Sequence, residues 1–145
     1  MDFFKALHTS STGLSAQRLR MNLISSNLAN INTTRTPQGG PYRRKEAVFE
    51  AVPVDRSFKN ALAMARTGQI AEVKVAGIVE DPVPFKQKYD PHHPDADGRG
   101  YVTVPNINLM EEMVNMISAT RSYEANVSAI KAAKSMALKA LDIGR

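Results

Sequence analysis

The clearest pattern in the chain lies near its C-terminal end, where apolar residues recur with alternating steps of four and three. The positions on this repeat are Leu109, Met113, Met116, Thr120, Tyr123, Val127, Ile130, Lys134, Ala137 and Leu141. All but Thr120 and Lys134 are apolar or aromatic, which is typical of a heptad interface between helices. We predict a helix from about Asn108 to Asp142, on the order of 50 Å long. A helix of this length needs another long helix to cover its apolar side.

The N-terminal end carries a weaker repeat of the same kind. Its heptad positions are Leu7, Leu14, Met21 and Leu28, with Phe3, Ser10, Gln17, Ile24 and Ile31 between them. Two of the intermediate positions are polar, and residues 9–13 are poor helix formers. We therefore predict a second, less stable helix that extends to about Asn30 and packs with the C-terminal helix as a coiled coil.

Short polar segments mark the ends of the two predicted helices. Asn108, with Glu111 three residues later, forms a plausible N-cap pair, and Gly144 is a natural stop. The N-terminal helix runs out in SSNLANINTTRTP, residues 25–37. Its asparagines can bond the free carbonyls of a helix end and tolerate left-handed backbone, so we interpret this stretch as a helix exit.

Between the helices the hydrophobic period changes to that of strands. Four segments fit: Tyr42–Val54, Ile70–Val79 with a bulge at Gly77, Phe85–Tyr89 and Tyr101–Val104. Four prolines between residues 82 and 94 separate the later strands. Residues 57–67 fit either a short helix or a loop, and the pattern of residues 51–69 does not define a structure.

The predicted fold class is mainly α with a small β domain. Long N- and C-terminal helices would pack together, with a short-stranded antiparallel β insert between them. The corresponding segments are an N-terminal helix (1–32), a linker with the β domain (33–105) and a C-terminal helix (106–145).

Composition excludes several classes of function. The chain of 145 residues has no cysteine, which excludes disulfides, thiolate metal sites and a cysteine nucleophile. Its net charge of +5 is spread along the chain, so we expect no nucleic-acid face. No segment has the roughly 20 apolar residues that span a bilayer, and we expect no direct membrane insertion. The first residues also lack the pattern of a cleavable signal peptide.

Histidines and carboxylates gather once, in DPHHPDADG at residues 90–98. Adjacent histidines point to opposite sides of an extended chain, so they rarely bind one metal ion. Proline, aspartate and glycine are each typical of turns, and we interpret this segment as a polar turn between two strands. Arg43, Arg44 and Lys45 are interpreted as the solvated end of a strand.

The nucleophile-elbow and phosphate-loop motifs are absent from the sequence. The chain therefore offers no supported catalytic, cofactor-binding or metal site, and we predict that it is not an enzyme.

Two long stretches resemble the flagellar axial proteins, the rod and hook family. GLSAQRLRMNLISSNLANINTTRT, residues 13–36, is similar to the N-terminal signature of that family, in which an amphipathic helix ends in Asn-Leu-x-Asn. The matching positions are Asn27, Leu28 and Asn30, followed by Thr33. PQGGPYRRK, from residue 37, and the whole segment from Gly77 to Arg145 resemble the proximal-rod type in particular.

This resemblance implies a structural subunit of the bacterial flagellar basal-body rod, with no cofactor. Its terminal helices would self-associate into the hollow axial drive shaft, beside other rod proteins and the basal-body adaptor at the rod base. The subunit would reach the periplasm through the flagellar type III export apparatus, without a cleaved signal peptide. The expected assembly interface comprises Leu7, Leu14, Met21, Ile24, Leu28, Leu109, Met113, Met116, Tyr123, Val127, Ile130 and Leu141.

A second hypothesis is a soluble helical-hairpin adaptor or binding module with a β insert. It would fold as a self-sufficient monomer or dimer and could use its basic N-terminal residues on nucleic acid in a salt-sensitive way.

Overall fold

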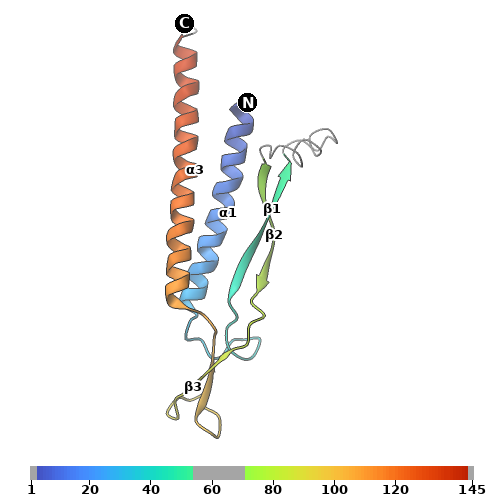
Figure 1. Cartoon of the computed structure of the whole chain (residues 1–145), viewed down its shortest axis with the longest axis vertical. Helices are drawn as coiled ribbons and strands as arrows, with labels where there is room; N and C mark the ends of the chain where they lie inside the picture. Colours follow the sequence, from blue (N-terminus) through green and yellow to red (C-terminus); the bar gives the residue numbers. More distant parts are fainter. Residues whose placement is uncertain (1–2, 54–70, 144–145) are drawn as a thin grey trace.

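The computed structural model describes residues 3–53 and 71–143 of the chain. The elements, in chain order, are α1 (Phe3–Ala29), β1 (Lys45–Pro53), β2 (Ala71–Glu80), β3 (Lys86–Tyr89), β4 (Tyr101–Val104) and α3 (Leu109–Ile143). The molecule is elongated, with the two long helices side by side and antiparallel, and with β3 and β4 at one end (Figure 1). The predicted fold class, two long terminal helices around a small antiparallel β region, is confirmed.

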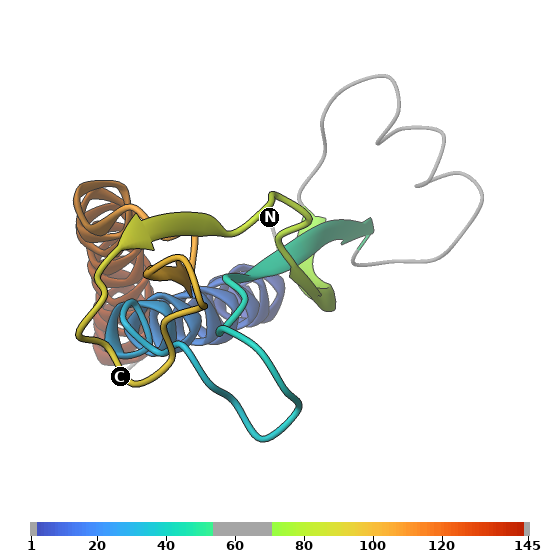
Figure 2. The ribbon, with the colours of Figure 1, turned by 90° about the horizontal axis from the view of Figure 1, so that it is seen from below.

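The helix α1 occupies the middle layer of the molecule. It contacts α3 on one side and both β1 and β2 on the other. Viewed along the helices, α1 lies between α3 and the β1–β2 ribbon (Figure 2). Because only α1 is covered on two sides, the fully buried apolar residues of the described chain are few. They are Ala16, Ile24, Val102, Pro105, Ile107 and Ala119.

The helix α1 ends close to the predicted position, but its end does not have the predicted left-handed backbone. The Asn30 backbone N–H and side-chain Nδ2 both donate to the Ser26 carbonyl, at 3.1 and 2.9 Å. Thr33 Oγ1 donates to Asn30 Oδ1 at 3.1 Å. Among the described residues only glycines have positive φ, so the expectation of left-handed asparagines was wrong. Backbone turn bonds together with the side chain of Asn30 therefore satisfy this helix end.

The start of α3 confirms one half of the predicted cap. Asn108 Oδ1 accepts a hydrogen bond from the Met110 N–H at 3.1 Å, as an N-cap residue does. Glu111, the predicted partner, is exposed, whereas the next residue, Glu112, is buried. The predicted stop at Gly144 lies outside the described residues.

The strands form two separate antiparallel ribbons, β1–β2 and β3–β4, rather than one small sheet. Val48 pairs with Gly77 and Phe49 with Val75, which leaves Ala76 without a partner and places the predicted bulge beside Gly77. The first strand begins at Lys45 rather than Tyr42, because the Tyr42 N–H donates to the Thr33 carbonyl instead of entering the ladder.

The third strand begins at Lys86 rather than Phe85, whose ring lies under the Arg43 guanidinium, 4.5 Å from its centroid. Val54, Ile70 and the segment 57–67 lie outside the described residues.

The segment between β3 and β4 is the predicted polar turn. Asp97 Oδ1 accepts hydrogen bonds from the Arg99 and Tyr101 N–H groups, both at 2.9 Å. Gly100 has a φ of +78°, a conformation that side chains other than glycine disfavour. Asp95 is used for a long-range contact, since it accepts a 2.7 Å hydrogen bond from Thr34 Oγ1. The turn is therefore held by its own backbone and by the segment that follows α1.

Candidate assembly site

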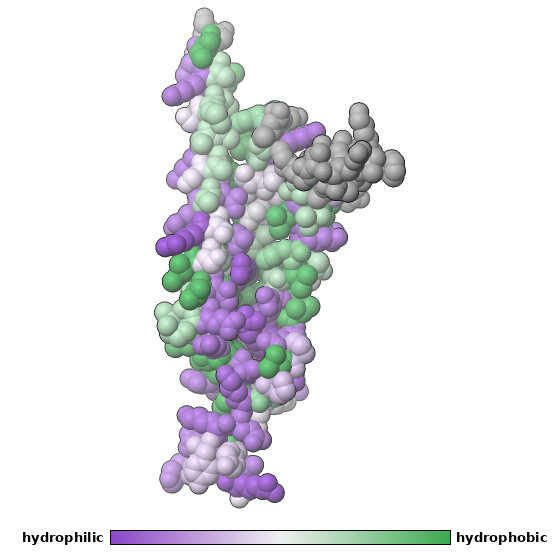
Figure 3. All heavy atoms as spheres, viewed as in Figure 1, coloured by the Kyte–Doolittle hydropathy of each residue, from purple (hydrophilic) through white to green (hydrophobic). Residues whose placement is uncertain are grey.

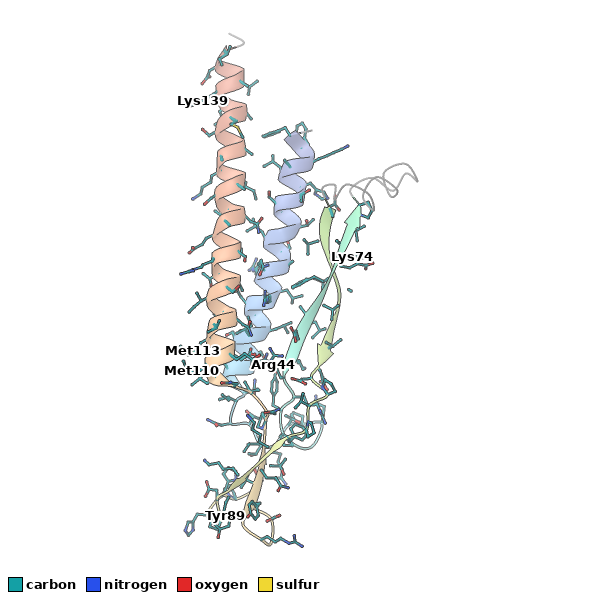
Figure 4. The ribbon with its side chains drawn as sticks, viewed as in Figure 1. Arg44, Lys74, Tyr89, Met110, Met113 and Lys139 are labelled. Carbon is teal, nitrogen blue, oxygen red and sulfur yellow. The ribbon has the colours of Figure 1, made fainter. Side chains whose placement is uncertain are left out.

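A buried polar cluster joins α1, the start of β1 and α3 at one end of the helix pair. We call it the joint; its members are Asn27, Tyr42, Arg44, Lys45 and Glu112. The label of Arg44 in Figure 4 marks its position between the helix ends and the β1–β2 ribbon.

Asn27 is the centre of the joint, and its side chain is 1% exposed. Its Oδ1 accepts from the Lys45 N–H at 3.0 Å and from the Tyr42 hydroxyl at 3.1 Å. Its Nδ2 donates to the Lys45 carbonyl at 3.0 Å and to Glu112 Oε2 at 3.1 Å. All four hydrogen-bonding positions of the amide are thus filled, as burial requires. Asn27 therefore connects α1, β1 and α3 through hydrogen bonds and does not serve as a helix cap.

Arg44 supplies the positive charge of the joint. Its Nε donates to Glu112 Oε1 at 2.7 Å, and the two side chains are 18% and 1% exposed. Its Nη1 lies 3.1 Å from a Glu46 oxygen and 3.9 Å from an Asp81 oxygen. Burial by itself lowers the pKa of Arg44, but the hydrogen bond and charge of Glu112, together with Glu46, outweigh it and raise that pKa above its ordinary value. The interpretation of Arg44 as a solvated strand end was therefore wrong.

The interface between α1 and α3 rests on small residues. Ala16 and Ala119 are buried, at 3% and 0% exposure. A Cβ on Gly13 would lie 3.2 Å from the Asn126 side chain, so α3 approaches α1 closely there. Glycine has a low helix propensity, but at position 13 the absence of a side chain allows this close packing of the two helices.

The predicted heptad of α3 matches this interface only in part. Met116, Tyr123, Val127 and Ile130 are half-buried. Leu109 and Met113 are 50% and 47% exposed, so α1 does not cover them, and Leu141, near the C-terminal end of α3, is 70% exposed; as assembly positions all three remain predictions. Glu112 and Ala119 are the buried residues of α3, at 1% and 0% exposure. The covered side of the helix is therefore centred on these two residues and not on its most apolar positions.

The predicted positions on α1 lie closer to the interface. Ile24 is 5% exposed, and Leu7, Leu14, Met21 and Leu28 are half-buried. Met21 meets α3 directly, because its Sδ accepts a 3.7 Å hydrogen bond from Thr120 Oγ1. Of the signature positions, Asn27 is in the joint, and Asn30 and Thr33 hold the helix exit.

Two apolar surfaces of α3 have no cover from the described part of the chain. The first, which we call the base patch, consists of Leu109, Met110, Met113, Val114 and Ile117, each between 47% and 67% exposed. Figure 3 shows hydrophobic atoms over this end of α3, and Figure 4 labels Met110 and Met113 there. Surfaces of this kind mark interaction sites.

The second surface is the C-terminal overhang, residues 138–143. Leu138, Leu141 and Ile143 are 53%, 70% and 86% exposed. Figure 1 shows α3 extending past the N-terminal end of α1. The overhang therefore exposes leucine and isoleucine where α3 extends past the described part of α1.

Among residues 3–53 and 71–143, no three histidine, cysteine or acidic side chains are arranged to hold a metal ion. Within the same described ranges, none of the helices is sufficiently long and apolar to cross a membrane.

Comparison with known proteins identifies the class of protein to which this architecture belongs. Residues 7–35 match the family described as "Flagella basal body rod protein", and residues 99–143 match "Flagellar basal body rod FlgEFG protein C-terminal". These two matches cover most of α1 with its exit, and β4 together with the whole of α3. The class defined by the paired terminal helices is thus a flagellar axial protein.

Curated relatives narrow the class further. The chain is similar to the flagellar basal-body rod protein FlgC of Borreliella burgdorferi, with 48% identity over 99% of this chain and 98% of the relative. It is 45% identical to FlgC of Bacillus subtilis over 100% of both chains, and 43% identical to FlgC of Salmonella typhimurium over 92% of both. The chain belongs to the FlgC family of flagellar basal-body rod proteins. Its function is that of a structural rod subunit, and the adaptor alternative is not favoured.

Sequence reasoning found Asn27 through the family signature but missed its role. It also missed Arg44 and Glu112, which are 68 positions apart along the chain. Their charges carry no local periodicity, and a signal would have required knowing that β1 starts beside the first turn of α3.

Proposed function

We propose that the chain builds the wall of the rod through its terminal helices, and that the uncovered apolar surface of α3 is where neighbouring subunits pack. The single observation that carries this proposal is the base patch. Five large apolar side chains of one helix, each about half exposed or more, lie within nine residues. A structural subunit needs such a surface, whereas a self-sufficient monomer would bury it.

Rigidity of the rod, in this proposal, comes from many modest apolar contacts summed over neighbouring subunits. Different patches on each subunit would meet, and contacts of this heterologous kind generate open helical arrays when the rotation does not close. The joint keeps the β1–β2 ribbon at a set position against α1, so that every subunit offers the same shape to its neighbours.

The proposed partners are other flagellar rod proteins, the basal-body adaptor at the rod base and further copies of this chain. The proposed location is the periplasmic rod, reached through the flagellar type III export apparatus without a cleaved signal peptide. No enzymatic role is proposed, because the relatives are named as rod proteins and the polar groups of the joint are used for structure.

The test compares two substitutions on neighbouring faces of α3. Val114→Asp places a charge in the base patch, at a side chain that is 64% exposed and therefore free of internal packing. We expect normal helix content but loss of motility and absence of the chain from purified basal bodies. Ser118→Asp, at an exposed polar position of the same helix, is the matched control and should remain motile. A wild-type chain that is absent from basal bodies would contradict the proposal.

A further inference from the structure

The methionines of the described chain differ in how far solvent reaches them. The sequence has seven methionines, and all but Met1 and Met64 lie in the described residues. Met21 and Met116 are half-buried, and the Met21 Sδ also accepts the 3.7 Å hydrogen bond from Thr120 Oγ1. Both side chains are therefore partly screened from solution by the folded chain.

Met110 and Met113, in contrast, are 67% and 47% exposed. They are three positions apart on α3, so their side chains lie on the same face of the helix. Both belong to the base patch, and Figure 4 labels them at that end of α3. The other members of the patch are hydrocarbon side chains, which mild oxidants leave unchanged: Leu109, Val114 and Ile117. Chemistry at the two sulfur atoms therefore changes the polarity of this one surface.

The reaction open to an exposed thioether is the transfer of one oxygen atom from a peroxide. A sulfur lone pair attacks one peroxide oxygen, the O–O bond breaks and an S–O bond forms. The proton on the transferred oxygen passes to the departing oxygen, which leaves as water. Sulfur is oxidised by two electrons and the peroxide is reduced by two. The product, methionine sulfoxide, is polar, and methionine sulfoxide reductases return it to the thioether.

We infer that Met110 and Met113 form an oxidation-sensitive site, at which conversion to the sulfoxides by a peroxide prevents the free subunit from entering the rod. This inference rests on the proposed function, in which neighbouring subunits cover the base patch. In the free chain the sulfoxide oxygens are hydrated, because both side chains are exposed, and the fold is unaffected. In a packed interface the same oxygens lose their water among apolar side chains, which is costly.

The first experiment treats the purified full chain with hydrogen peroxide and follows each methionine by peptide mass spectrometry. We expect Met110 and Met113 to gain an oxygen atom severalfold faster than Met21 and Met116. The helix content and the urea midpoint of the chain oxidised at Met110 and Met113 should match those of the unmodified chain. Similar rates at all four positions would overturn the inference, as would loss of helix on oxidation of the exposed pair alone.

The second experiment uses substitutions in cells that assemble flagella. Met110→Gln with Met113→Gln imitates the polarity of the sulfoxides, whereas Met110→Leu with Met113→Leu keeps the patch apolar without sulfur. We expect the glutamine variant to be absent from purified basal bodies and the leucine variant to be present. Met136→Gln, at a methionine that is 65% exposed outside the patch, is the matched control and should assemble. Assembly of the glutamine variant, or loss of the Met136→Gln chain as well, would show that the site is wrongly assigned.

The third experiment measures sulfoxide directly, in a strain without methionine sulfoxide reductases that is briefly exposed to hydrogen peroxide. We expect Met110 and Met113 sulfoxides in the soluble pool of the chain and their depletion in the chain recovered from basal bodies. Equal sulfoxide fractions in the two pools would overturn this inference and not the proposed function. Absence of the untreated wild-type chain from basal bodies would instead contradict the proposed function itself.

Discussion

Arg44 Nε and Glu112 Oε1 lie 2.7 Å apart, and the Glu112 side chain is 1% exposed. This ion pair joins the residue before β1 to the first turn of α3, and Asn27 of α1 bonds the other oxygen of the same carboxylate at 3.1 Å. A buried pair adds little net stability over an apolar one, but removing one partner leaves a buried charge and is costly. The pair therefore specifies one arrangement of helices and ribbon.

The first prediction concerns Glu112. Glu112→Ala leaves the Arg44 guanidinium and the Asn27 amide without their acceptor, and we expect the free energy of unfolding to fall by about 3–5 kcal/mol. Glu112→Gln keeps the shape and should cost less. Urea unfolding of the free chain measures both. Glu111→Ala, at the exposed neighbouring position, is the control and should change stability by no more than about 0.5 kcal/mol. Equal losses for Glu111→Ala and Glu112→Ala would contradict this role.

The pH dependence of the joint follows from Arg44. Its pKa is raised in the folded state, so its stabilisation is fully present below the unfolded-state pKa and is lost only as pH rises through the folded-state pKa. We expect no change in the Arg44 contribution between about pH 6 and pH 9. Comparison of the wild-type chain with Arg44→Met by urea unfolding across that range checks it; a difference that varies with pH contradicts it.

The third prediction uses the charge of the joint itself. Asn27→Asp replaces the Nδ2 donor with a carboxylate oxygen that faces Glu112 Oε2 and the Lys45 carbonyl. We expect it to destabilise the chain more than Asn27→Ala does, because like charges then meet in a buried site. Adding Glu112→Gln should recover part of the loss, as a double-mutant cycle would show. Asn22→Asp, on the exposed side of α1, serves as the control.

The fourth prediction tests the close approach at Gly13. Gly13→Leu forces a side chain against Asn126, where even a Cβ would lie 3.2 Å away. We expect a loss of about 1–3 kcal/mol despite the better helix propensity of leucine. Adding Asn126→Ala should recover part of this lost stability, because the double variant lacks the side chain that the leucine would meet. Ser11→Leu, at an exposed position two residues earlier, should gain or hold stability in thermal unfolding. If Ser11→Leu and Gly13→Leu change the stability equally, the close approach of α3 to Gly13 does not limit the side chain at that position.

The fifth prediction compares two glycines of the turn between β3 and β4. Gly100 has a φ of +78°, and a Cβ there would lie 3.0 Å from the Tyr89 ring, whereas a Cβ on Gly98 meets nothing within 4 Å. Gly100→Ala should therefore cost about 1–2 kcal/mol of local stability, with little change for Gly98→Ala. Hydrogen exchange of the Tyr101 amide reports on the ribbon directly. Unchanged protection in Gly100→Ala would show that the turn tolerates the side chain.

Several elements were predictable because their signals are local. The heptad spacing predicted α3 to within a residue at each described end, and Asn108 marked its cap. Alternating apolar residues and Gly77 predicted β2 with its bulge. The separation into two ribbons was not predictable, because pairing partners depend on the path of the chain between strands.

The residues of the candidate site were also predictable only in part. Met116, Tyr123 and Val127 were predicted on the side of α3 that meets another helix, and they are half-buried. Leu109 and Met113 share the same repeat but remain exposed, because Glu112 and Ala119 take the buried places beside them. As an assembly interface these residues remain a prediction.

The sequence by itself determined two long helices, a β insert and the family, because heptads, caps and signature motifs act through neighbours a few residues apart. Only the tertiary structure decided which side of α3 stays uncovered and that Asn27, Arg44 and Glu112 form one buried cluster. The reason is physical: charges from three distant segments can enter an interior only when they arrive together, and that meeting is a property of the folded chain.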